Sequence, residues 1–412
     1  MKRAFSVVSL LVAAAIALAA CSPVPAAFTP PTDPLGVVTI PKGEPLHIAF
    51  WGVLSGADST LGEDSKRGVE IAIDDKGGKL LGRDIRLTTE DGLCTPEGGA
   101  TAGQKLAADT TIVGLIGSSC SDETVGGIKA ITDAGLTTIS PSNTRPALTA
   151  ADRSADFAGY LRTAHSDAFQ GKAVAEFVFN ELKLKNAATI HDGSAYAEAL
   201  QQVFSDEFVK LGGTIVAHEA VKKGDTDMKP VLTTIAAAHP DVIYHPVFNA
   251  EGGFIVAQAH EVPGLENVVL IGSDGMFSPE MLKGAGPAAE GMYLSAPNFA
   301  AFQSGYAAFL TKYKTKYGGD PLAVFNAHGY DAANILFAAI EKVQVTAPDG
   351  TTYIPRSLLR AAIYATKDFQ GLTGVLSCGI NGDCGAPIIA MYQVTADNVA
   401  NLTIPSVPIW PK

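Results

Sequence analysis

The amino-acid sequence predicts an α/β protein with two lobes, each built around a parallel sheet. The first observation is length, because 412 residues are too many for one core of ordinary size and fit two domains. The second is the alternation of apolar strands with amphipathic helices along most of the chain. The third is a repeated order of helix, Gly-Gly and strand, with the glycines at 77–78 and 212–213. Together these observations favour two similar lobes.

Composition indicates a large buried interior. Hydrophobic residues make up 47% of the chain and charged residues 17%, against a usual charged share of about 25%, which excludes intrinsic disorder. Beyond the N-terminus no apolar run approaches the roughly 20 residues that a membrane-spanning helix needs. The net charge of −12 argues against nucleic acid or an anionic lipid surface as the partner.

The N-terminus is typical of an exported protein. Lys2 and Arg3 precede an apolar run that ends in small residues before Cys21, which predicts a signal peptide over 1–20. The sequence Leu18-Ala19-Ala20-Cys21 resembles a bacterial lipobox, in which the cysteine is lipidated and anchors the mature protein. The alternative is an ordinary signal peptide that happens to contain a cysteine. Seven prolines from 23 to 45 then predict an extended tether over 21–45.

Two series of elements follow the expected tether. Hydrophobic runs and periodicity place strands at 46–51, 84–89, 111–116 and 136–139, with helices through 67–73, 96–109 and 122–133 between them. The second series has helices at 167–182, 200–211, 228–238 and 251–260, with strands at 187–190, 214–217, 241–247 and 268–271.

Signatures of catalysis are absent from the sequence. It contains no G-x-S-x-G, H-E-x-x-H, G-x-x-x-x-G-K-[ST] or G-x-G-x-x-G motif, so we expect a protein that is not an enzyme and uses no cofactor. An exported hydrolase using His191 remains a rival hypothesis. Four cysteines besides Cys21 allow three pairings, of which proximity favours Cys94 with Cys120 and Cys378 with Cys384. Their spacing does not favour a metal site.

Polar residues gather at four strand ends, where open α/β sheets bind their ligands. The segments 117–121 and 140–144 offer hydroxyls and backbone N–H groups, which suit a carboxylate. The segments 191–196 and 272–275 offer an acid and an aromatic ring. Together the four match the two ends of an amino-acid zwitterion. The plain structural alternative is that these residues cap helices and fill turns.

Several ordered motifs resemble the leucine/isoleucine/valine-binding proteins of bacterial ABC transporters. They are Leu54-Ser55-Gly56, 90–96 (EDGLCTP), 139–149 (ISPSNTRPALT), Leu161-Arg162-Thr163, Ile190-His191-Asp192 and 288–292 (AAEGM). The resemblance implies a type I periplasmic binding protein, with two Rossmann-like lobes and a three-crossing hinge that close like a Venus flytrap. Lobe 1 would comprise 46–165 and 297–387, and lobe 2 would comprise 166–296 and 388–412.

The resemblance also implies a ligand site. It assigns the ligand carboxylate to Ser121 and Thr144, with backbone contacts at Ser142, and assigns the ammonium to Asp274. The other positions that it implies are the aromatic residues Tyr196 and Phe248, Leu61 beside the ligand side chain, and a disulfide between Cys94 and Cys120. This sequence departs from the family pattern at Asp122-Glu123, Phe248 and Asp274, which leaves the identity of the amino acid open.

The implied function is a solute-binding lipoprotein that delivers an amino acid, branched-chain or otherwise aliphatic, to membrane permease subunits driven by separate ATPase subunits. We expect a monomer, exported and held at the outer face of the cell membrane or in the periplasm. Two alternatives keep the scaffold: an amide, urea or aromatic acid as ligand, or a sensor that signals to a receptor.

Overall fold

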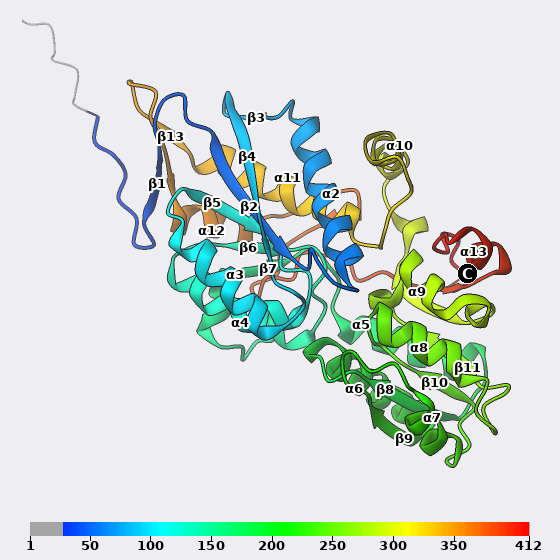
Figure 1. Ribbon diagram of the computed structural model, residues 1–412. Coiled ribbons are helices and arrows are strands. Elements are labelled where there is room, and N and C mark those ends of the chain that lie inside the picture. Colours follow the sequence, from blue (N-terminus) through cyan, green and yellow to red (C-terminus); the bar gives the residue numbers. More distant parts are fainter. Residues whose placement is uncertain (1–27, 412) are drawn as a thin grey trace, which may run out of the picture.

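Two six-stranded sheets organise the computed structural model, which describes residues 28–411 (Figure 1). The strand order is β3-β4-β2-β5-β6-β7 in the first sheet and β17-β12-β11-β10-β8-β9 in the second. All pairs are parallel except β3 with β4 and β12 with β17. We call the body built on the first sheet lobe 1 and the body built on the second sheet lobe 2. The predicted α/β fold with two parallel-sheet lobes is confirmed.

Lobe 1 follows the predicted alternation closely. Its central strand β2 is buried along its whole length, with Ile48 and Phe50 in the core on one face of the sheet and Ala49 and Trp51 in the core on the other. The elements are β2 (Leu46–Gly52), α2 (Ser59–Asp75), β3 (Lys79–Leu80), β4 (Arg83–Asp91), α3 (Pro96–Ala108), β5 (Ile112–Ile116), α4 (Ser121–Asp133), β6 (Thr138–Ser140) and β7 (Tyr160–Arg162).

Lobe 2 repeats the pattern with two local differences. The helix predicted over 167–182 is α5 (Asp167–Glu176) followed by a π-helical turn, Phe177–Glu181. The strand predicted over 241–247 stops at Tyr244, because the following residues leave the sheet and lead into α8. The remaining elements are β8 (Asn186–His191), α6 (Ala195–Lys210), β9 (Thr214–Ala220), α7 (Lys229–Ala236), β10 (Val242–Tyr244), α8 (Asn249–Ala259), β11 (Val269–Gly272), α9 (Pro279–Ala285), β12 (Tyr293–Pro297) and β17 (Ile389–Gln393).

The chain returns to lobe 1 after β12, where α11 packs against α2 and against the sheet at β5 and β6. The elements of this return are α10 (Gly305–Tyr317), α11 (Asn326–Val343), β13 (Val345–Thr346), β14 (Thr352–Pro355), α12 (Arg356–Tyr364), β15 (Phe369–Gln370) and β16 (Val375–Leu376), and α13 (Ala396–Asn401) follows β17.

Three chain crossings join the lobes, after β7, after β12 and before β17. Backbone hydrogen bonds hold them side by side: Arg162 N–H donates to Gly382 O at 2.9 Å, Cys384 N–H donates to Arg162 O at 3.0 Å, and Asn298 N–H donates to Ile388 O at 2.9 Å. The exact lobe boundaries stay a prediction. The crossings give the fold a compact hinge about which the lobes could rotate.

The expectation of a tether over 21–45 is wrong for residues 28–45. Residues 28–45, which we call the N-terminal strap, lie on lobe 1, where β1 (Val37–Ile40) pairs antiparallel with β14. The Asp33 carboxylate accepts hydrogen bonds from the Ser357 backbone N–H and hydroxyl, and Arg83 donates to the carbonyls of Pro41 and Glu44. The prolines flank 37–40 without entering it, so this β-branched stretch is free to form an edge strand. The predicted signal peptide and Cys21 lie outside the described residues.

Candidate functional site

A small cavity between the lobes collects the residues that the sequence singled out. The space between its lining atoms, open solvent at its mouth included, is about 240 Å³. Lobe 1 contributes Leu61, Ser119, Cys120, Ser121, Ser142 and Phe325, and lobe 2 contributes Tyr196, Phe248, Asp274 and Gly275. Six of the seven predicted ligand residues therefore line one cavity. Thr144 is the exception: it is buried nearby, and its hydroxyl has no hydrogen-bond partner among residues 28–411.

The sheet topology explains this convergence. Ser121 begins α4 after β5, and Ser142 follows β6. On lobe 2, Tyr196 lies in the first turn of α6 after β8, Phe248 precedes α8 after β10, and Asp274 follows β11. Because parallel strands bring their carboxyl ends to one edge of a sheet, these loops meet where the two lobes face each other.

The lobe 1 wall presents hydroxyls and a helix N-terminus. Ser121 is the first residue of α4, and its hydroxyl accepts a long hydrogen bond of 3.4 Å from the Arg145 N–H. The Ser142 hydroxyl donates to Ser119 O at 2.9 Å, which ties the two loops together. Free N–H groups at a helix start favour a negatively charged group. This wall can therefore hold a carboxylate.

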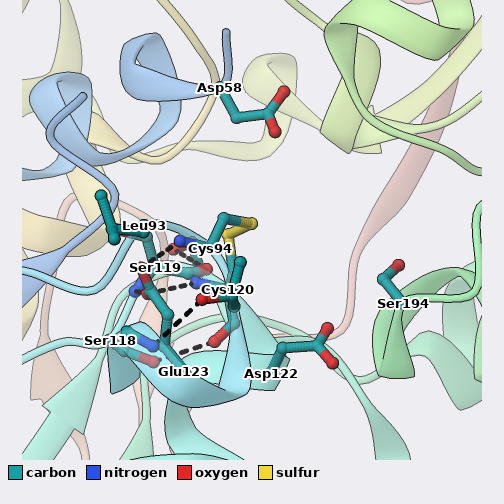
Figure 2. The surroundings of a disulfide bond; sticks show 12 residues. Asp58, Leu93, Cys94, Ser118, Ser119, Cys120, Asp122, Glu123 and Ser194 are labelled. Carbon is teal, nitrogen blue, oxygen red and sulfur yellow. Dashed lines mark hydrogen bonds between the residues drawn. A yellow bond between two sulfur atoms is a disulfide. The ribbon is translucent and has the colours of Figure 1, made fainter. Parts of the chain in front are cut away.

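A disulfide and a buried glutamate fix the loop before α4 (Figure 2). Cys94 and Cys120 are bonded, as are Cys378 and Cys384, so both pairings that proximity favoured are confirmed. The Glu123 carboxylate accepts hydrogen bonds from the N–H groups of Cys94, Ser119 and Cys120 at 2.9, 3.0 and 2.9 Å. Burial raises the pKa of Glu123 to about 7, although these three donors favour its charged form. Glu123 thus faces the protein interior and not the cavity.

The lobe 2 wall is an acid held by a polar network. Asp274 Oδ1 accepts hydrogen bonds from the Tyr196 hydroxyl at 2.6 Å and from Gln170 Nε2 at 3.0 Å. The Tyr196 hydroxyl also lies 2.6 Å from Ser273 Oγ, and the Tyr196 and Phe248 ring centroids are 5.2 Å apart. An oriented carboxylate beside two aromatic rings suits a cationic nitrogen.

The two lobes contact each other at the rim of the cavity. The Asp122 carboxylate accepts hydrogen bonds at 3.0 and 3.2 Å from the Ala195 N–H at the start of α6, and in Figure 2 its side chain points toward Ser194. Lys223 lies 3.1 Å from Asp58, and Asn249 Nδ2 donates to Thr60 Oγ1 at 3.3 Å. Asp122 therefore faces the N-terminus of a helix in lobe 2, whereas Glu123 faces the interior of lobe 1. These two acids are the ones that depart from the pattern of the resembled family.

Sequence reasoning missed several residues of the site. Ser119 and Cys120 lie in the strand end 117–121 that the sequence singled out, but neither is among the predicted ligand residues. Phe325 comes from the start of α11, whose sequence carries no binding motif. Asp167 and Gln170 lie on the first turns of α5, just behind the cavity, and the Leu161-Arg162-Thr163 motif before them was their nearest signal.

Two features are absent from the described part of the chain. Residues 28–411 contain no group of three or more His, Cys, Asp or Glu side chains placed to hold a metal ion. Among the helices of the same residues, none combines the length and the apolar character that a membrane span requires.

Comparison with known proteins gives consistent matches over most of the chain. A family model described as periplasmic binding protein matches residues 45–399. The Leu/Ile/Val-binding protein homolog 3 of Brucella melitensis is 26% identical over 344 residues, which cover 82% of this chain and 89% of that protein.

Solved structures agree with this match. A branched-chain amino acid transporter substrate binding protein of Streptococcus pneumoniae, in complex with isoleucine, superposes with a TM-score of 0.75 at 25% identity, covering 85% of this chain and 96% of that one. An ABC transporter solute binding protein of R. palustris, in complex with benzoate, has a TM-score of 0.74 at 21% identity, covering 89% and 95%. The latter likeness shows the shared fold alone.

Proposed function

The chain belongs to the periplasmic binding protein family, and on that premise we propose that it binds an α-amino acid with an aliphatic side chain between its two lobes. The proteins that it matches include a Leu/Ile/Val-binding protein homolog and a branched-chain amino acid transporter substrate binding protein in complex with isoleucine. The observation that carries the proposal is the polarity of the cavity, with hydroxyls and a helix N-terminus on one wall and an acid on the other. A zwitterion complements both walls at once.

Each residue has a proposed role. Ser121 binds the carboxylate together with the N–H groups at the start of α4, and Ser142 lines the same wall. Thr144 joins them if its unpaired hydroxyl turns toward the ligand. Asp274 pairs with the ammonium, while Tyr196 and Phe248 cover it and Leu61 contacts the aliphatic side chain.

Closure of the lobes follows from this division of contacts. The ligand docks on one lobe, and only the closed state adds the contacts of the other, so binding shifts the equilibrium toward closure. The rim contacts between Asp122 and α6 and between Lys223 and Asp58 favour the same state. We further propose that the closed form delivers its ligand, as a monomer, to permease subunits coupled to separate ATPase subunits.

Export and anchoring complete the proposal. The signal features of 1–20 and the lipobox-like residues before Cys21 support a mature lipoprotein held outside the cytoplasm, in the periplasm or at the outer face of the membrane. Mass spectrometry of the mature protein from its native host measures the acyl mass on Cys21. An unmodified cysteine inside an intact chain would refute this part alone.

A thermal-shift panel tests the ligand class. Twenty amino acids, benzoate, urea and acetamide are each compared with buffer, because a ligand at a hundredfold above its dissociation constant stabilises by roughly 2.7 kcal/mol. We expect the largest shift from an aliphatic amino acid. A shift from benzoate, urea or acetamide alone would favour the alternative ligands.

A matched pair of variants tests the site. Asp274→Ala leaves the ammonium without its charge partner, so calorimetry should show an affinity lower by roughly 2 to 5 kcal/mol. Asp206→Ala removes an exposed acid of the same lobe and should change nothing. Equal affinities for both variants would refute the assignment of Asp274.

A further inference from the structure

The N-terminal strap is fastened to lobe 1 near both of its ends. Arg83 on β4 donates hydrogen bonds to Pro41 O in the strap at 2.6 Å and to Gly350 O, close to β14, at 2.7 Å. Near the start of the strap, the Asp33 carboxylate accepts hydrogen bonds from the Ser357 backbone N–H and hydroxyl. Hydrogen bonds that involve a charged group are among the stronger ones in proteins. The strap is therefore a fixed part of lobe 1.

The strap and its partner strands form an exposed face, which we call the strap face and define as Phe28, Thr39, Val345 and Tyr353. Antiparallel pairing places Thr39 and Val345 directly opposite Tyr353, so these three side chains share one side of the small sheet. The Phe28 ring stacks on the Tyr353 ring with 5.7 Å between centroids. Phe28 and Val345 are exposed, and the other side of the same strands packs into the core of lobe 1. The strap face thus presents aromatic and apolar groups and no charge.

The fastened strap leaves a short connection to the predicted lipid anchor. Only the six residues 22–27 separate Cys21 from Phe28. A fully extended chain covers at most about 3.6 Å per residue, so Phe28 can lie no more than about 25 Å from Cys21. The tether that the sequence predicted over 21–45 would have allowed about 85 Å. Docking of the strap therefore removes most of the reach.

This connection is shorter than the protein is wide. A compact body of residues 28–411 has a radius of gyration of about 21 Å and hence a diameter of at least about 50 Å. A lipid on Cys21 therefore cannot reach a membrane that lies beyond the far side of the body, and the side that carries Phe28 has to face the lipid. Figure 1 shows β1 and β13 at the end of lobe 1 that is remote from lobe 2.

We propose that the strap face lies against the surface of the membrane that holds the lipid on Cys21. This inference rests on the proposed function, from which it takes the acylated Cys21. Aromatic side chains are favoured at the depth of the lipid headgroups, and residues 22–32 carry no charged side chain that would oppose the approach. The contact does not depend on charge, so the acidic body does not prevent it on zwitterionic lipid.

The contact fixes the orientation of the two lobes. Lobe 1 is held at the membrane, and lobe 2 lies farther from it (Figure 1). Because the lobes rotate about the three crossings, closure on a ligand appears as a movement of lobe 2 toward a fixed lobe 1.

Quenching of tryptophan fluorescence by brominated lipid tests this orientation. Val345→Trp places a reporter on the strap face, and Val209→Trp places a matched reporter on an exposed position of α6 in lobe 2. The acylated full-length proteins are reconstituted in phosphatidylcholine vesicles whose acyl chains are brominated near the headgroup. The emission of wild type, which has Trp51 and Trp410, is subtracted. We expect bromination to reduce the emission of Val345→Trp and to leave that of Val209→Trp unchanged.

Release of the strap gives a second measurement. Adding Arg83→Ala to Val345→Trp frees the strap and lengthens the connection, so the loss of emission should become smaller. Tyr353→Trp reports from the same face if Val345→Trp does not fold. An unchanged loss after Arg83→Ala would overturn the inference, because the docked strap would then not set the contact.

The remaining outcomes separate the inference from its premise. Equal losses from Val345→Trp and Val209→Trp, or no loss from either, in protein whose Cys21 carries its acyl mass would overturn the inference alone. Mass spectrometry of the same samples measures that mass. An unmodified Cys21 would refute the anchoring part of the proposed function and this inference with it, while amino-acid binding in the thermal-shift panel would still stand.

Discussion

Glu123 offers a quantitative test of how the binding loop is held. Its carboxylate lies beneath the Cys94–Cys120 disulfide and receives three backbone N–H groups. Burial raises its pKa from 4.5 to about 7. Since each pKa unit corresponds to about 1.4 kcal/mol, the protonated form is favoured in the folded protein by about 3 kcal/mol.

The sign of the pH dependence follows from that shift. Glu123 stabilises the folded state fully below pH 4.5, and this contribution is lost as pH rises through about 7. Glu123→Gln cannot ionise, so it lacks this dependence. We expect the free energy of unfolding of wild type, measured relative to the variant, to fall by up to about 3 kcal/mol between pH 4 and pH 8.

Urea unfolding at several pH values measures this difference. Other buried acids titrate as well, but they are common to both proteins and cancel in the comparison. Glu97→Gln, at an exposed glutamate in the first turn of α3, is the matched control and should run parallel to wild type. If Glu123→Gln also runs parallel, Glu123 does not titrate as its burial predicts and the reasoning fails.

Three other predictions concern the rim, the strap and the disulfides. Asp122→Asn removes the charge that faces the start of α6. Such a charge contributes roughly 1 kcal/mol at a helix N-terminus, so the affinity for the ligand should fall about fivefold. Unchanged affinity by calorimetry would show that this contact does not favour closure. Arg83→Ala should release the N-terminal strap and speed tryptic cleavage at Lys42 about tenfold, because hydrogen bonds from a charged group contribute roughly 1.5–3 kcal/mol; equal cleavage rates would contradict this. Removing the Cys94–Cys120 disulfide, which closes a loop of 26 residues, should lower the free energy of unfolding by about 3.5 kcal/mol. Removing the Cys378–Cys384 disulfide, with a separation of 6 residues, should lower it by about 2 kcal/mol. The reverse order in urea unfolding would refute the loop-closure argument.

The sequence predicted best those features that depend on local pattern. Apolar runs predict β2, β4, β5, β6 and β8 to β11, but not the short strands β3 and β7. The site loops follow from polar residues at strand ends. The N-terminal strap escaped prediction because β1 pairs with β14, more than 300 residues away, and proline content concealed a short β-branched stretch. Local pattern carries no information about such a partner.

Burial explains the other omissions at the site. Asp167 reads as an ordinary helix-starting acid in the sequence, and only tertiary packing buries it. Phe325 enters the cavity from α11 because the chain returns to lobe 1 after completing most of lobe 2. The end of β10 at Tyr244 likewise depends on the turn that leads into α8. Tertiary packing, which local pattern does not encode, decides these features.

The last strand of lobe 2 sets the order in which the protein can be completed during synthesis. β17 covers the edge of β12, and Ile389 lies opposite Pro297 in that pair. A ribosome adding about 5–20 residues per second needs roughly 5–20 s to make the chain between them. Throughout that interval the backbone groups on this edge of β12 lack their strand partner, and such an edge can recruit other chains. The nascent protein therefore passes through a stage in which the sheet of lobe 2 lacks its last strand and has an open edge at β12.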